Sequence, residues 1–331
     1  MRYIVYGAGA VGGGIGARLH QHGHDVILIA RGDHLAKIQS QGLVIHAAEG
    51  SATLPIPAVS QPSEIGFRDG DVVFLTMKSQ DTLPALEDLR AAAGPAIPVI
   101  TAQNGVANER MAARRFHHVY AMLVMMPASF LTPGEVVLHG SPMSGWLDAG
   151  VYPRGTDRLI ERLCAEISSS AMVARPDPNV MRIKYAKLRS NLNNAVDALI
   201  GGESRGGPVV ARLIEEADAC FAAAGIDAAT NEELLAGRAA AMTDADIPGH
   251  PREGTSSWQS LARGRSIEVD YLNGEIALLG RLHGVPTPYN RAVQHLANEA
   301  ARLGVRPGTT DESAIVALAE RYASQVDVAA G

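Results

Sequence analysis

Short apolar runs alternate with helical patterns through the first half of the chain. The run Arg2–Tyr6 is apolar and β-branched, and a glycine-rich turn, a helical stretch to His22 and a second apolar run at 26–29 follow it. Residues 71–76 (DVVFLT) are almost continuously apolar, as expected of a strand that is covered on both faces of a parallel sheet. This alternation of strand and helix predicts a doubly wound parallel sheet.

The remaining elements of the first half are shorter. We predict strands at 43–46, 53–57, 98–101 and 120–125. A helix is predicted at 83–89 with Asp81 as its N-cap. Two late strands, expected to be antiparallel, are predicted at 136–138 and 145–147, followed by a helix at 157–167 and a strand at 172–174.

The pattern changes after Arg175, where two prolines at 176 and 178 make a natural domain boundary. Beyond them the periodicity is almost entirely helical. We therefore predict an α/β domain over 1–175 and an all-helical C-terminal domain over 176–331. Helical segments are predicted at 179–199, 208–224, 231–241, 257–282, 289–303 and 311–325.

The turn after the first strand has the G-x-G-x-x-G spacing of a dinucleotide-binding loop. It contains, in order, Gly7, Ala8, Gly9, Ala10, Val11 and Gly12. Gly7 permits a tight turn, Gly9 lets the backbone approach a pyrophosphate, and Gly12 lets the helix pack closely on the strand. The alternative is a glycine-rich turn that binds no ligand. Its place between a strand and a helix predicts that these residues bind a dinucleotide at the helix N-terminus, in a Rossmann domain.

The second apolar run ends in Arg31, where NAD-binding chains usually carry an acidic residue for the ribose 2′-hydroxyl. A guanidinium matches a 2′-phosphate in charge and geometry. The sequence therefore predicts NADP(H) as the cofactor. Asp33 leaves an alternative open, because an acid at this point can bind the ribose or cap the next helix.

Composition is that of an ordinary globular protein. The 331 residues are 47% hydrophobic and 19% charged, which suffices for two domains. The net charge of −6 argues against nucleic acid as a partner. Because no apolar run reaches membrane-spanning length and no signal pattern precedes the first strand, we expect a cytoplasmic protein without membrane contact. Cys164 and Cys220 are expected to be reduced core thiols, and no ligand spacing predicts a metal site.

Two polar turns follow predicted strands of the α/β domain. Lys78 follows the strand at 71–76, and Asn104, before Gly105, follows the next one. Ligands of open α/β sheets bind outside the carboxyl ends of the strands, so both side chains are candidates for cofactor or substrate contacts. The alternatives are a solvated loop lysine and an asparagine that only builds a turn.

The helical half carries two further candidate clusters. Lys187 and Asn191 are four residues apart and therefore share a helix face. A lysine beside amides suits an anionic or carbonyl ligand, although a lone helical lysine is more often a solvated surface charge. Ser256 and Glu268 belong to a second polar cluster, for which an ordinary charged helix start is the alternative.

Together these motifs resemble those of the ketopantoate reductase (2-dehydropantoate 2-reductase) family over nearly the whole chain. Those that carry the resemblance are GAGAVGG at 7–13, LTMKSQD at 75–81, QNG at 103–105, KLRSN at 187–191, TSSWQSLARGRSIEVDYLNGEI at 255–276 and GVPTPYN at 284–290. The last three, in this order and spacing, are the most specific.

The resemblance implies an enzyme that reduces a 2-keto acid with NADPH in a cleft between the two domains. The expected reaction is 2-dehydropantoate to pantoate, a step of pantothenate biosynthesis. Lys187 would be the general acid and Glu268 a catalytic carboxylate that binds a substrate hydroxyl. The positions that match substrate contacts are Asn104, Asn191 and Ser256. The positions that match cofactor contacts, besides the glycine-rich loop, are Arg31, Lys78 and Asn104.

Two departures from the family pattern leave the substrate open. Ala195 stands where the family often has a second asparagine that contacts a substrate hydroxyl, and the segment 140–148 is unlike that of the typical biosynthetic enzyme. The alternatives are a relative that reduces a different 2-keto acid or carbonyl compound, and a non-catalytic NADP(H)-sensing protein. The oligomeric state is also open, with a homodimer as one option.

Overall fold

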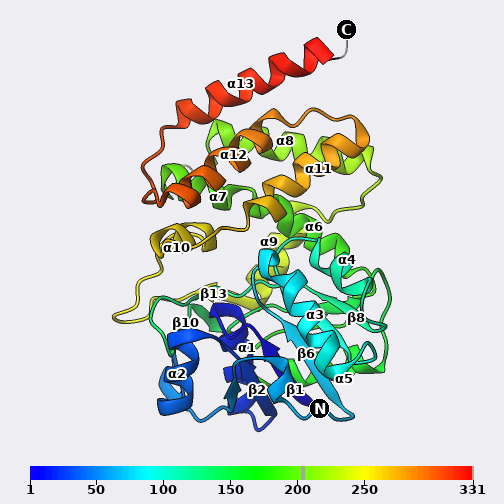
Figure 1. Ribbon diagram of the computed structural model, residues 1–331, viewed down its shortest axis with the longest axis vertical. Helices are drawn as coiled ribbons and strands as arrows, with labels where there is room; N and C mark the ends of the chain where they lie inside the picture. The colour runs from blue at the N-terminus through cyan, green and yellow to red at the C-terminus, as the bar shows by residue number, and fades with distance from the viewer. Residues whose placement is uncertain (203–205, 330–331) are drawn as a thin grey trace. The chain divides into compact units, whose positions relative to one another are not determined.

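The computed structural model describes residues 1–202 and 206–329, which divide into two compact units (Figure 1). The first unit comprises Met1–Lys184 with Thr230–Arg252, and the second comprises Tyr185–Ala229 and the chain from Glu253 on. These units differ from the predicted division at 175/176 because the first turns of a helix and a later strand both pack within the first unit. The assignment of cofactor and substrate roles to two domains stays a prediction.

The main sheet of the first unit has the strand order β12-β8-β7-β6-β1-β2-β5. All neighbours in it are parallel except β12, which is antiparallel to β8. Because the order runs outward from β1 in both directions, the predicted doubly wound topology is confirmed. The strands are β1 (Arg2–Tyr6), β2 (Asp25–Ile29), β5 (Ala58–Val59), β6 (Asp71–Leu75), β7 (Val99–Thr101), β8 (Val119–Met122) and β12 (Ala149–Val151).

Alternate residues of β1 pack into two different cores, one on each face of the sheet. Tyr3 and Val5 join a cluster with residues of α1 (Ala10–Gln21) and α5 (Arg158–Ser168). Ile4 and Tyr6 join another with residues of α3 (Thr82–Ala93) and α4 (Asn108–Ala113). Burial on both faces explains why the central strands are apolar at nearly every position.

A second sheet has the order β4-β3-β10-β9. Its strands are β3 (Leu43–Ala47), β4 (Gly50–Leu54), β9 (Ala128–Ser129) and β10 (Glu135–Leu138). β10 is antiparallel to β9 but parallel to β3, so the prediction for 136–138 is only half right. A tight hairpin places β4 earlier than the predicted strand at 53–57, because β3 and β4 pair from Ala47 and Gly50 onward.

Two other local predictions are wrong. Residues 145–147 and 172–174 are not strands but make isolated bridges, in which Trp146 pairs with both Met125 and Val173. Asp81 is the N-cap residue of α3, as predicted, but its side chain makes no capping hydrogen bond, and it also ends a 3₁₀ turn at Ser79–Asp81. A strand was also missed in the chain beyond 175. This strand, β13 (Met242–Asp244), follows α9 (Asn231–Ala241) and pairs with β11 (Gly140–Pro142) in the first unit.

Helices make up the second unit, in agreement with the predicted helical half. The helix α6 (Val180–Asn191) begins in the first unit and continues into the second, where α11 packs on α8 and α12 packs on α7, α8 and α13. Their bounds are α7 (Asn193–Ile200), α8 (Pro208–Ala223), α10 (Ser256–Ala262), α11 (Asn273–His283), α12 (Pro288–Leu303) and α13 (Glu312–Ala329).

Two predicted long helices are interrupted. The segment 179–199 breaks at Leu192, whose N–H bonds the carbonyl of Arg189 in a tight turn. The segment 257–282 breaks after α10, where Gly264 has φ +61° and a 3₁₀ turn at Val269–Tyr271 follows. Across residues 1–202 and 206–329, no helix combines the length and the apolarity needed to cross a membrane.

Candidate functional site

The glycine-rich loop joins β1 to α1 in a conformation that requires two of its glycines. Gly7 has φ +106°, and a Cβ there would lie 2.7 Å from the backbone nitrogen of Met77. A Cβ on Gly12 would lie 2.3 Å from both the carbonyl oxygen of Gly7 and the Thr76 hydroxyl. The turn and the close helix approach expected from the sequence are therefore present.

Gly9 differs from its neighbours because it has space around it. It is the N-cap residue of α1, makes no side-chain capping bond, and a Cβ added to it would meet no atom within 4 Å. The first N–H groups of a helix lack partners within the helix and attract anions. An open N-terminus without a covering side chain fits the pyrophosphate of a dinucleotide.

Two side chains lie at this loop, that of Arg31 just before α2 (Gly32–Gln41) and that of His34 in the first turn of α2. His34, which sequence reasoning missed, is buried with Nε2 2.6 Å from the Ala8 carbonyl, and its Nδ1 accepts the Gly134 N–H at 2.8 Å. Its Nε2 therefore carries the proton, and burial lowers the pKa of the ring. Arg31 is exposed at the carboxyl end of β2 and hydrogen-bonds Tyr6, whose pKa is raised mainly by burial. Arg31 thus lies at the strand end expected for a ribose contact.

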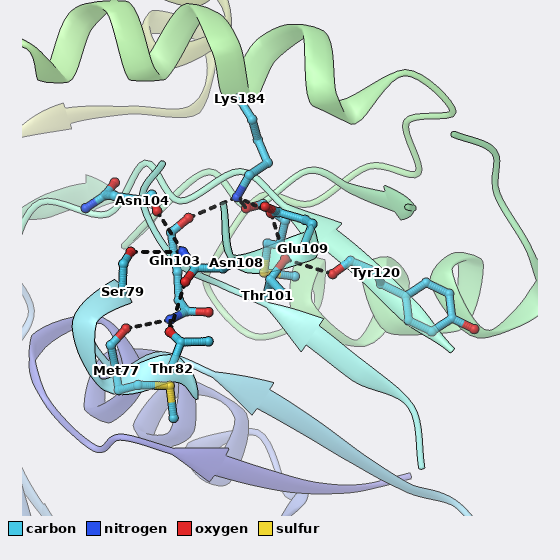
Figure 2. Close-up of polar contacts among 11 residues, drawn as sticks. Met77, Ser79, Thr82, Thr101, Gln103, Asn104, Asn108, Glu109, Tyr120 and Lys184 are labelled. Carbon is cyan, nitrogen blue, oxygen red and sulfur yellow. Dashed lines mark hydrogen bonds and ion pairs between the residues drawn. The ribbon is translucent and has the colours of Figure 1, made fainter. Parts of the chain in front are cut away.

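The two polar turns after β6 and β7 are joined by side-chain amides (Figure 2). The Gln103 Nε2 donates to the Met77 carbonyl at 2.8 Å and to the Thr82 hydroxyl at 2.7 Å. Because β6 and β7 are parallel neighbours, both turns lie at the same edge of the sheet. This edge brings together the predicted residues Lys78 and Asn104.

A second amide strengthens the same junction. The Asn108 Nδ2 donates to the Ser79 hydroxyl at 3.0 Å and to the Asn104 carbonyl at 3.1 Å, and its Oδ1 accepts from Thr82 at 2.9 Å. Figure 2 shows these bonds as one continuous network. The backbone of the Asn104 turn is therefore held from two sides.

A buried ion pair that sequence reasoning missed lies beside this network. The Nζ atom of Lys184 is 2.9 Å from Glu109 Oε1 and donates to the carbonyls of Gln103 at 2.9 Å and Met122 at 3.0 Å. The Thr101 hydroxyl donates to the same carboxylate oxygen at 2.8 Å. The two charged side chains are 3% and 0% exposed. The sequence signal for Lys184 was a charged residue among the apolar positions of the helix predicted at 179–199.

The second unit contains the other candidate residues. Lys187 lies in the middle of α6, half-buried, and Asn191 is the buried last residue of that helix. Ser256 is the exposed first residue of α10, and Glu268, half-buried, immediately precedes the 3₁₀ turn. Ala195 is fully buried in α7.

Hydrogen bonds tie the segments of Ser256 and Glu268 to the α6–α7 stretch. The Thr255 N–H donates to Asp197 Oδ2 at 2.8 Å, and the Thr255 hydroxyl donates to the Asn194 carbonyl at 3.0 Å. The Nδ2 of Asn273, at the start of α11, donates to the Leu192 carbonyl at 3.3 Å. The starts of α10 and α11 are thus both fixed next to the end of α6. Asp197 and Asn273 do this positioning and were not recognised in the sequence.

Both cysteines are buried free thiols, as predicted. Burial raises the pKa of Cys164 to about 12 and that of Cys220 to about 11. Because the thiolate is the nucleophilic form, neither is suited to catalysis at neutral pH.

Comparison with known families gives two matches that follow each other along the chain and overlap at residues 149–153. The family model described as ketopantoate reductase PanE/ApbA matches residues 3–153, and the model of its C-terminal part matches residues 149–301. A curated 2-dehydropantoate 2-reductase from Mesorhizobium japonicum is 29% identical, with 91% of this chain and 98% of the relative covered.

Solved structures give the same fold over the same length. A PanE/ApbA family ketopantoate reductase from Ralstonia eutropha is 30% identical with a TM-score of 0.77, covering 92% of this chain and 99% of the other. A D-mandelate dehydrogenase in ternary complex with NADH and anilino(oxo)acetate is 25% identical with a TM-score of 0.79, at the same coverage.

Proposed function

The chain belongs to the ketopantoate reductase family, and we propose that it reduces 2-dehydropantoate to pantoate with NADPH. The observation that carries this proposal is the pair of family matches, which together extend from residue 3 to residue 301. Relatives named 2-dehydropantoate 2-reductase align over nearly their full length, which supports the same substrate class, a small 2-keto acid.

A nicotinamide dinucleotide is the cofactor expected on this fold, and the open N-terminus of α1 at Gly9 fits its pyrophosphate. We also propose that the protein prefers NADP(H) to NAD(H). It is supported by the exposed guanidinium of Arg31 at the end of β2, which suits a 2′-phosphate. Lys78 adds a second cation at the neighbouring strand ends. When bound, the cofactor supplies the hydride that the substrate carbonyl carbon accepts.

The proposed role of Lys187 is to donate a proton to the carbonyl oxygen as that oxygen gains negative charge. A half-buried lysine beside Asn191 can stabilise a developing alkoxide and then protonate it. Glu268 would bind a hydroxyl of the substrate. Asn104, Asn191 and Ser256 would orient the substrate through its polar atoms. In this scheme the first unit binds the cofactor and the second supplies the acid.

Steady-state oxidation of NADPH by purified protein with 2-dehydropantoate tests the proposal. Lys187→Ala should lower kcat by about 10²–10⁴-fold while the Kd for NADPH stays within about twofold, because only proton transfer is removed. Arg189→Ala is the matched control on the same helix, since Arg189 makes a surface ion pair with Asp218. A Lys187→Ala protein with wild-type turnover would eliminate Lys187 as the acid.

The likeness to D-mandelate dehydrogenase favours one second candidate, an aryl-substituted 2-keto acid as substrate. Ala195 is consistent with it, because the family's second asparagine is replaced by a buried methyl group. A panel of 2-dehydropantoate, phenylglyoxylate and pyruvate, each with NADPH and NADH, separates the candidates by kcat/KM. Tight NADPH binding without oxidation across the panel would instead indicate a non-catalytic NADP(H) sensor.

A further inference from the structure

The helix α6 carries two lysines about one turn apart, and the environment of the first is unusual. An ammonium group has three donors and no acceptor. All three donors of Lys184 have partners within the first unit, namely Glu109 Oε1 and the carbonyls of Gln103 and Met122. No donor is left for a substrate. Lys184 is therefore a fixed cation rather than a second proton donor.

One partner of Lys184 lies in the turn that carries the candidate residue Asn104, and the other two lie in neighbouring elements of the first unit. The carbonyl of Gln103 belongs to the same peptide group as the N–H of Asn104. Met122 ends β8, and Glu109 belongs to α4. Figure 2 shows the Lys184 side chain reaching from its helix to this turn. One ammonium thus holds the first turns of α6 to the carboxyl edge of the sheet.

The network continues from there to the neighbouring turn. The Gln103 side chain bonds the Met77 carbonyl, one residue before Lys78. Thr101 at the end of β7 donates to the Glu109 oxygen that faces Lys184. Among the described residues the other oxygen, Glu109 Oε2, has no hydrogen-bond partner. The ammonium group of Lys184 therefore compensates the buried negative charge of this carboxylate.

Stability alone does not account for such a pair. Desolvating two charges offsets most of their attraction, and a neutral pair of similar shape is often as stable. Orientation is a different requirement, because a displacement of about 1 Å can lower a rate about 10²-fold. A buried, fully bonded lysine on the helix of the acid meets that requirement.

We propose that Lys184 is a positioning residue of the reductase, which fixes the first turns of α6, the helix that carries Lys187, to the carboxyl edge of the sheet at the turn of Asn104. The rate part of this inference rests on the proposed function, because it takes Lys187 as the proton donor. The anchoring part concerns only the first unit and the first turns of α6.

The double variant Lys184→Met/Glu109→Gln tests the proposal. It removes both charges while keeping their shape, whereas Lys184→Met alone would leave a buried unpaired carboxylate and destabilise the fold. We expect kcat to fall about 10–100-fold while the Kd for NADPH stays within about threefold. The decrease of kcat at alkaline pH, where the proton donor is lost, should occur at the same pH as in the wild type. The variant retains Lys187, and its net charge is unchanged.

An ion pair between the half-buried Arg2 and the buried Asp71, at the opposite edge of the same sheet, provides the control. Arg2 donates to both oxygens of Asp71, at 2.8 and 2.6 Å, at the amino ends of β1 and β6. Arg2→Met/Asp71→Asn should lower the melting temperature but leave kcat within about twofold. An equal loss of kcat in both double variants would mean that Lys184 acts only through general stability, and would overturn the proposal.

Amide hydrogen exchange gives a readout that does not depend on turnover. In Lys184→Met/Glu109→Gln, exchange should accelerate about tenfold or more at 103–105 and 180–187 but not at 7–13. Unchanged exchange together with wild-type kcat would refute the anchor. Disappearance of the decrease of kcat at alkaline pH would also refute the anchor, because it would show that Lys184 itself is the proton donor. If the wild type reduces no 2-keto acid, the proposed function fails, while the exchange experiment still tests the anchor.

Discussion

Replacing Gly9 by alanine separates cofactor binding from folding. The φ of Gly9 is −74°, which alanine adopts freely, and the new methyl group would meet no atom within 4 Å. Alanine is a poorer N-cap than glycine by about 1 kcal/mol, but it also restricts the unfolded chain by about 0.4–1 kcal/mol. These effects oppose each other. The melting temperature should therefore change by no more than about 2–4 °C, the shift per 1 kcal/mol in a domain of this size.

The effect of Gly9→Ala on binding should be much larger. Its methyl group would project into the space that a pyrophosphate needs at the start of α1. Displacing one phosphate oxygen from a backbone N–H removes a hydrogen bond to a charged group, worth about 1.5–3 kcal/mol. Since 1.4 kcal/mol corresponds to a tenfold change in Kd, NADPH should bind about 10–100-fold more weakly.

Gly12→Ala is the opposite case. Its methyl group would lie 2.3 Å from the Gly7 carbonyl oxygen and from the Thr76 hydroxyl, so the helix must move. Overpacking of this kind costs about 1–3 kcal/mol or more, and the melting temperature should fall clearly. Fluorescence titration with NADPH and thermal unfolding of both variants check the pair. A Gly9→Ala protein with wild-type affinity would show that the loop does not bind the pyrophosphate.

Charge and burial elsewhere in the two units give three further predictions. Arg31→Ala should weaken NADPH binding about 10–100-fold and NADH binding less than about threefold, and equal losses in titrations with both nucleotides would contradict its 2′-phosphate role. Because burial lowers the pKa of His34 below its usual 6.5, the folded chain binds fewer protons than the unfolded chain, so the free energy of unfolding should decrease as the pH falls below about 6.5. His34→Gln should reduce that pH dependence in urea titrations, and an unchanged slope would assign it to another group. Burial raises the pKa of Cys164 to about 12 and that of Cys220 to about 11, so a thiol reagent at pH 8 should label neither until the chain unfolds; rapid labelling of the native protein would contradict their burial.

Features that depend on neighbouring residues could be predicted from the sequence. The glycine-rich loop was recognised because the turn, the close approach and the helix start each require particular residues within six positions. The central strands were recognised because burial on both faces leaves little choice but apolar residues. Lys187 and Asn191 were grouped because helix geometry alone places residues four apart on one face. The helix boundaries at Leu192 and Gly264 were less accessible, because helical periodicity continues on both sides of each break.

Contacts between distant segments depended on the packing of the chain. His34 accepts the N–H of a residue 100 positions away, and Lys184 bonds a carbonyl 81 positions away. No local pattern specifies these partners, since a buried histidine or lysine can be satisfied by many groups. The same holds for β13, which joins the first unit because its backbone pairs with β11. Local chemistry thus predicted the glycine-rich loop and placed Lys187 and Asn191 on one helix face, whereas the bonds that hold their supporting turns and helices in place could be identified only once the sheet brought distant segments together.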